Sequence, residues 1–156
     1  MYKGGTILEA KAYDFLCQHK TMVLACMEED GTPYCLPLTY YLDETFTFYF
    51  TTPKPSRKYN NMMKNPTVQF VVFDDRFDPT SVTVEGNVSE VTDQQRCRDI
   101  TVSIVDRVWK DTPFFPTSFR LEKKSLAVMS IKAINIEWFQ DKVLDSVIEK
   151  KAFTRI

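Results

Sequence analysis

Apolar and polar residues alternate along much of the chain, which is the two-residue period of β-strands. In "PYCLPLTYYL" every second residue is apolar and shares one face, namely Tyr34, Leu36, Leu38, Tyr40 and Leu42. The same kind of pattern predicts six strands, over 20–27, 33–42, 45–52, 67–74, 81–91 and 125–139. Pro33 and Pro37 cannot donate ladder hydrogen bonds, so the second strand is expected at a sheet edge or to be locally irregular.

Three segments have the 3.6-residue period of helices instead. A capping box of Thr6 and Glu9 precedes an apolar stripe that ends near His19. A short helix is predicted over 56–64, where "NP" stops it, and a longer amphipathic one follows a second capping box at 92–95.

Turn signals set the strand connections. Asp-Gly at 30–31 predicts a hairpin, a tight turn is expected at 43–44, and Gly86 is a candidate β-bulge. Strands joined by short turns pair antiparallel, and six twisted strands tend to close into a barrel. We therefore expect a mainly β fold, a six-stranded antiparallel barrel with peripheral helices, in a single domain over 1–156.

Charge and composition exclude several classes. The net charge of −1 argues against nucleic-acid binding, and the apolar run 22–27 is too short to span a membrane. The first fifteen residues lack a signal-peptide core, so a cytoplasmic protein is expected. Four cysteines without a C-x-x-C pair predict buried, reduced thiols rather than disulfides or zinc. The one histidine, His19, excludes a histidine metal cluster and is expected to end a helix.

The stretch "TTPKPSRK" carries the strongest chemical signal. A helix N-terminus offers free N–H groups and partial positive charge, and both favour an anion. Thr51, Thr52 and Ser56 add hydroxyl groups, while Arg57 and Lys58 add charge in the first turn, where cations oppose the helix dipole. Two interpretations stay open at this point, a phosphate site and an ordinary solvated helix start.

Several short motifs follow one another in a fixed order between residues 15 and 92. They are "DG-P" in the first hairpin, "P-L-T-Y", "F-Y-F-T-T", "SRK" opening the helix, "NP" ending it, and "V-T-V-E-G". This ordered set resembles the FMN-binding split-barrel proteins related to pyridoxamine 5′-phosphate oxidase. The resemblance implies that FMN is the cofactor and that its phosphate is bound by Thr51, Thr52, Ser56, Arg57 and Lys58.

The resemblance has further implications for the ring and for the assembly. The strand with Pro37, Leu38 and Thr39, and also Tyr40, would run along the flavin ring and contact it mainly through backbone. Such proteins are homodimers with flavin at the interface. The aromatic loop around Trp109, Phe114 and Phe115 would complete the partner's site or fold onto its own barrel.

Some positions depart from the oxidases themselves. Those enzymes have an arginine-bearing "R-x-V-L-L-K" where this chain has "PLTYYL", a glutamine where it has Ser81, and a different C-terminal segment. The chain is more similar to the branch of general-stress flavoproteins and nitroimidazole-resistance-like reductases.

The expected activity is a flavin-dependent oxidoreductase that passes electrons from reduced nicotinamide or flavin to a small acceptor. No side chain stands out as catalytic. The alternatives are a flavin-binding module without turnover, for storage, sensing or stress protection, and a split barrel that binds haem or a deazaflavin. Haem would need His19 or a weaker methionine or cysteine ligand.

Overall fold

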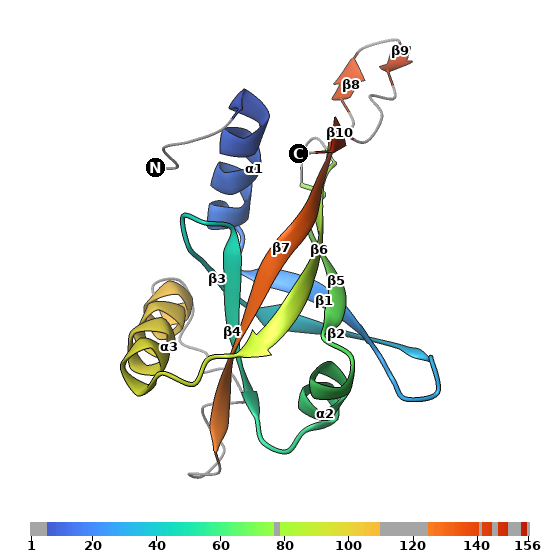
Figure 1. The fold of residues 1–156 in the computed structure, drawn as a ribbon. Coiled ribbons are helices and arrows are strands. Elements are labelled where there is room, and N and C mark those ends of the chain that lie inside the picture. Colours follow the sequence, from blue (N-terminus) through green and yellow to red (C-terminus); the bar gives the residue numbers. More distant parts are fainter. Residues whose placement is uncertain are drawn as a thin grey trace.

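The predicted strands form one curled antiparallel sheet, a half-barrel with the core on its concave side (Figure 1). The computed structural model describes residues 6–76, 79–109, 125–140, 142–144, 147–149 and 154–155. The sheet strands are β1 (Thr21–Met27), β2 (Pro33–Thr39), β3 (Tyr41–Leu42), β4 (Thr47–Pro53), β5 (Thr67–Asp74), β6 (Thr80–Glu90) and β7 (Leu126–Gln140). Their spatial order is β2-β1-β5-β6-β7-β4-β3.

The main sheet thus has seven successive strands rather than the six predicted. The stretch 33–42 divides at Tyr40: β2 pairs with β1 at one edge, whereas β3 pairs with β4 at the other. Tyr40 is fully buried, and its hydroxyl donates a 2.6 Å hydrogen bond to the Leu16 carbonyl. The alternating pattern of the stretch 33–42 continues through Tyr40, because β2 and β3 both direct their even-numbered side chains toward the same core.

The C-terminal segment adds three short strands that the hydrophobic pattern does not predict. β10 (Thr154–Arg155) pairs with β7, while β8 (Lys142–Leu144) and β9 (Val147–Glu149) form a separate hairpin.

The local predictions for turns and edges are confirmed. β2 lies at the sheet edge, and Gly31 adopts the positive φ of 84° in the first hairpin. The register of β6 on β7 shifts at Gly86, as expected of a bulge. A Cβ at Gly86 would lie 2.6 Å from the Lys132 carbonyl oxygen, so only glycine allows this close approach.

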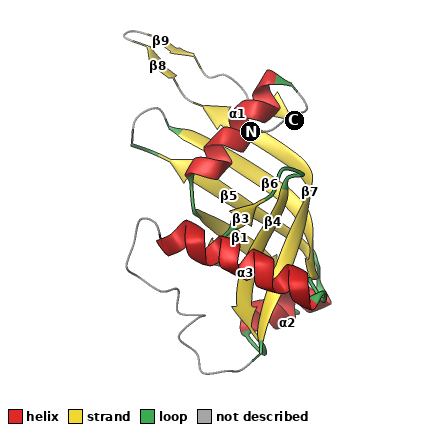
Figure 2. Cartoon of the chain, turned by 90° about the vertical axis from the view of Figure 1, so that its left-hand side faces the viewer, coloured by secondary structure: helices red, strands yellow, loops and turns green. Residues whose placement is uncertain are grey.

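Three helices surround the sheet: α1 (Ile7–Gln18), α2 (Arg57–Lys64) and α3 (Gln94–Trp109). α1 and α2 add Leu16 and Met62 to the core inside the half-barrel, where Phe48 and Phe70 meet edge to face at 4.7 Å. α3 lies on the outside, against β3, β4 and β7, and makes a second apolar cluster with Tyr49 (Figure 2).

The helix starts agree with the sequence, with one shift. Thr6 and Glu9 form the predicted capping box, and Ser56 is the N-cap of α2. The second capping box at 92–95 predicts Thr92 as the N-cap, but α3 is capped one residue later, where Asp93 Oδ1 accepts a 2.7 Å hydrogen bond from Arg96 N. None of the helices in the described ranges is long and apolar enough to cross a membrane.

One expectation about the cysteines is wrong. All four thiols are free, but only Cys26 is buried, and Cys35 is exposed. The reason is register: Cys35 is an odd-numbered residue of β2, so it points away from the face that carries Tyr34 and Leu36.

Candidate functional site

The junction between β4 and α2 brings hydroxyl groups to the first turn of a helix. Thr51 and Thr52 lie buried near the end of β4, and Thr52 Oγ1 is 3.0 Å from Ser56 Oγ. Ser56 Oγ also accepts a 3.3 Å hydrogen bond from Tyr59 N, as an N-cap should. The first-turn N–H groups of Arg57 and Lys58 have no partner within the helix, and remain as donors.

Three cations surround this junction, and two of them are already paired. Lys54 forms an ion pair with Glu90 of β6. Arg57 forms one with Glu28, just after β1, and its guanidinium lies 4.3 Å from the centre of the Tyr34 ring. These contacts attach the loop and the start of α2 to two different strands.

Lys58 is the exception. It is half-buried, and within the described part of the chain it has no carboxylate partner. Burial lowers the pKa of Lys58, because its ammonium group loses water, and the neighbouring Cys26 thiol offsets this only in part. An anion beside Lys58 would remove this penalty, so hydroxyls, free N–H groups and an unpaired cation here suit a phosphate group.

The residues expected along a flavin ring lie on the neighbouring edge strand. Pro37 is exposed, whereas Leu38 and Thr39 are half-buried. The same strand carries Tyr34, which contacts Arg57, so β2 starts beside the α2 N-terminus. A rise of about 3.3 Å per residue places Pro37 roughly 10 Å farther along the edge.

Two of the predicted site residues, Tyr40 and Trp109, contribute no described side-chain contact to this cluster. The Tyr40 hydroxyl is bound to Leu16, and its backbone N–H donates to the Lys20 carbonyl, so its polar groups serve the fold. Trp109 is the last residue of α3, but its side chain, Phe114 and Phe115 lie outside the described residues.

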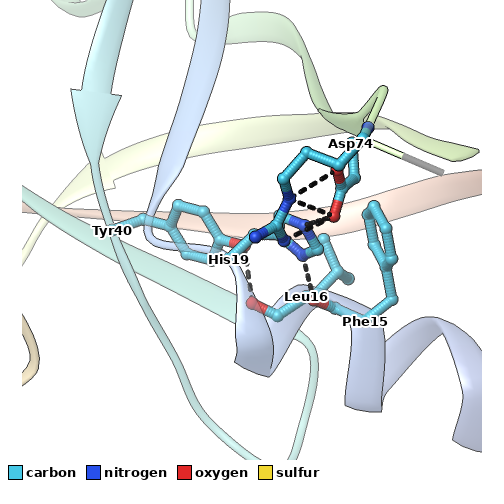
Figure 3. A network of polar contacts seen from close by, with 6 residues as sticks. Phe15, Leu16, His19, Tyr40 and Asp74 are labelled. Atoms are coloured by element: carbon cyan, nitrogen blue, oxygen red, sulfur yellow. Dashed lines mark hydrogen bonds and ion pairs between the residues drawn. The ribbon is translucent and has the colours of Figure 1, made fainter. Parts of the chain in front are cut away.

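His19 ends α1 as predicted and has a partner that the sequence did not indicate (Figure 3). Its Nδ1 is 2.7 Å from the Phe15 carbonyl oxygen and its Nε2 is 3.1 Å from Asp74 Oδ2. Arg76 Nη2 donates a 2.7 Å hydrogen bond to the same carboxylate oxygen. With both ring nitrogens engaged, His19 fastens α1 to the end of β5.

This contact predicts a pH dependence of stability. Hydrogen bonds from Arg76 first, and then from His19, hold the pKa of Asp74 well below its usual range. A carboxyl whose pKa is lowered by folding stabilises the protein above the unfolded pKa of about 3.9, and loses that contribution as the pH falls. Urea unfolding between pH 7 and pH 3 should therefore show a smaller acid-induced loss for Asp74→Asn than for the parent.

The control for this test is Asp14→Asn, since Asp14 is exposed on α1 and has no hydrogen bond or ion pair to a described residue. Equal acid sensitivity of the parent and Asp74→Asn would contradict the role of this carboxylate.

Sequence reasoning missed Glu28, Tyr34 and Glu90, which contact the cations Arg57 and Lys54 near the start of α2. No local motif marks them, because each contact joins residues far apart in the chain. No cluster of three or more histidine, cysteine, aspartate or glutamate residues able to hold a metal occurs in the described ranges.

Solved structures from other proteins share this fold. A candidate 5-nitroimidazole antibiotic resistance protein from Bacteroides thetaiotaomicron superposes with a TM-score of 0.68 at 14% identity, over 82% of this chain and 81% of its own. An FAD-binding protein from Mesorhizobium loti gives 0.63 at 23% identity, over 85% and 92%. A heme-binding protein from Mycobacterium smegmatis gives 0.73 at 12% identity, over 99% of this chain but 59% of its own.

At the level of sequence, no match was found among curated proteins. The sequence profile of the pyridoxamine 5′-phosphate oxidase family, in contrast, matches residues 8–137. That range contains the half-barrel up to Glu137 of β7, together with the β4–α2 junction, α2, α3 and all of α1 except its first residue. The chain therefore belongs to the pyridoxamine 5′-phosphate oxidase family.

Proposed function

We propose that this protein binds FMN and uses it as an oxidoreductase, passing electrons from a reduced nicotinamide or flavin to a small acceptor. Membership of the family supports a flavin, as does the similarity in fold to an FAD-binding protein. The observation that carries the proposal is Lys58, a half-buried cation without a carboxylate partner among the described residues, beside free N–H groups and the Thr52–Ser56 hydroxyl pair.

Each group then has a distinct role. The first-turn N–H groups and the hydroxyls of Thr52 and Ser56 donate to the phosphate, and Lys58 supplies charge. The Thr51 side chain points to the opposite face of β4, toward α3, so Thr51 would contribute through its backbone. Arg57 contributes only if it shares its guanidinium between Glu28 and the phosphate, because two of its nitrogens already face that carboxylate. The edge strand at Pro37, Leu38 and Thr39 faces the ring through its backbone. Redox chemistry comes from the flavin itself.

Binding is tested by comparing FMN with riboflavin, which lacks the phosphate. Flavin fluorescence quenching should show that FMN binds at least about a hundredfold more tightly, since charge-assisted hydrogen bonds contribute roughly 1.5–3 kcal/mol each. Equal affinity for the two flavins would contradict a phosphate site at α2. Oxidation of NADH or NADPH with quinones or nitro compounds then separates an enzyme from a binding module without turnover.

A homodimer is proposed as the binding unit. α1 and α2 pack against the core at the two ends of the half-barrel, and α3 lies on β3, β4 and β7, which leaves the outer face of β1 and β5 uncovered by the described helices (Figures 1 and 2). On that face Val23 pairs with Val71, both half-buried, and Phe73 is 57% exposed. A second copy packed there would cover this apolar surface. Sedimentation should then give twice the mass of one chain.

The haem alternative fits this chain less well. The only histidine uses both ring nitrogens within the fold, so His19 would have to leave α1 and β5 to bind iron. Titration with haemin, read from its Soret band, gives the direct comparison with FMN.

A further inference from the structure

The loop between β4 and α2 is attached on both sides to one carboxylate. Glu90, the last residue of β6, pairs through Oε1 with Lys54 Nζ, and its Oε2 accepts a 2.8 Å hydrogen bond from the Tyr59 hydroxyl. Lys54 precedes and Tyr59 follows the segment 56–58. The Glu90 side chain therefore binds one residue on each side of the segment that is proposed to hold the phosphate.

These contacts are partly exposed to water and supported by others. The Glu90 side chain is 22% exposed, and Lys54 Nζ lies 5.3 Å from the centre of the Tyr59 ring. The backbone of Lys54 is fixed as well, because its N–H donates to the Ser125 carbonyl at 2.9 Å and its carbonyl accepts from Ser125 Oγ at 3.2 Å. The backbone of the loop is thus held by Ser125, the residue before β7, and its side chains are held by Glu90 of β6.

The pairing also decides which cation is available. The Lys54 ammonium is paired with the Glu90 carboxylate and lies against the Tyr59 ring, so its charge is already balanced. Lys58 is left to provide the positive charge for a ligand.

We propose that Glu90 is a positioning residue for the phosphate of the bound flavin. By binding Lys54 and Tyr59 together, it keeps Ser56 and the first-turn N–H groups in the arrangement that a phosphate needs. This inference rests on the proposed FMN site, and it assigns a specific role to a residue that does not contact the ligand.

The test replaces the ion pair with neutral side chains of similar size, so that the net charge stays the same. Lys54→Met with Glu90→Gln should raise the Kd for FMN about tenfold, the size of one lost charge-assisted contact. The Kd for riboflavin should change less than about twofold, because riboflavin does not use the phosphate site. Tyr59→Phe, which alters no charge, should shift the same ratio by about threefold.

The matched control is Lys64→Met with Glu29→Gln. It makes the same two substitutions in the exposed ion pair at the far end of α2, and it should leave the FMN-to-riboflavin ratio unchanged.

The outcomes are distinct. Equal losses of FMN and riboflavin affinity in Lys54→Met/Glu90→Gln would overturn the proposal, because they would indicate a purely structural role. An unchanged ratio in both Lys54→Met/Glu90→Gln and Tyr59→Phe would overturn it as well. Failure of the proposed function looks different, since the parent itself would then bind FMN no better than riboflavin.

Discussion

Replacing Arg57 and Lys58 together with alanine is expected to weaken FMN binding by about a hundredfold or more. Each charge-assisted contact to the phosphate contributes roughly 1.5–3 kcal/mol, and each 1.4 kcal/mol corresponds to a factor of ten. The measurement is a fluorescence titration of purified protein with FMN, repeated at low and moderate salt. If the double variant binds FMN as tightly as the parent, the phosphate does not bind at α2.

The two single variants should weaken FMN binding by different amounts. Lys58→Ala removes a half-buried cation that has no carboxylate partner in the described chain, so it should account for most of the loss. Arg57→Ala should cost less than about tenfold, because the side chain is 61% exposed and Glu28 competes for its guanidinium. Lys64→Ala, in the last turn of the same helix, is the control and should leave affinity unchanged.

Replacing Arg107 with alanine is expected to lower the free energy of unfolding by about 3 kcal/mol or more. The Arg107 guanidinium donates from α3 to three carbonyl groups at the end of α1, those of Leu16 (2.9 Å), Cys17 (2.8 Å) and His19. The Leu16 carbonyl keeps its hydrogen bond from the Tyr40 hydroxyl, but the Cys17 and His19 carbonyl groups lose the Arg107 donor, and each buried polar group without a partner costs roughly 1–3 kcal/mol. Without Arg107, α1 would lose these hydrogen bonds to α3.

Urea unfolding at neutral pH provides the measurement. Arg98→Ala is the matched control, since Arg98 is exposed on the same helix and has no hydrogen bond or ion pair to a described residue. Equal stability of Arg107→Ala and Arg98→Ala would show that these carbonyl groups find other partners.

Much of the fold can be predicted from local pattern. Alternation of apolar residues places the strands, and capping residues such as Ser56 place the helix starts, because both depend on neighbours in sequence. Which strands pair with each other, in contrast, is not determined by the local sequence. Nothing around Tyr40 indicates that β2 and β3 join opposite edges, because the apolar face continues through the change.

The same limit applies to the site. The sequence indicated Thr52, Ser56 and Lys58 as a group, and the fold places the first two in contact. The sequence also indicated Arg57 as a cation available to a phosphate. In the structure, however, Arg57 forms an ion pair with Glu28, which lies in the hairpin between β1 and β2. Which cation stays unpaired is decided by tertiary contacts, and the pattern of one segment does not contain them.

The pairing of β4 with β7 also fixes when this site can form. Thr52, whose hydroxyl lies at the N-terminus of α2, pairs with Ala127, and the Lys54 backbone forms hydrogen bonds with Ser125. During synthesis the chain emerges from its N-terminus, so β4 and α2 are complete long before their partner strand exists. Closing such a long loop carries an entropic cost that local hairpins avoid. The N-terminus of α2 therefore acquires its final geometry only after Ser125 and Ala127 have been made.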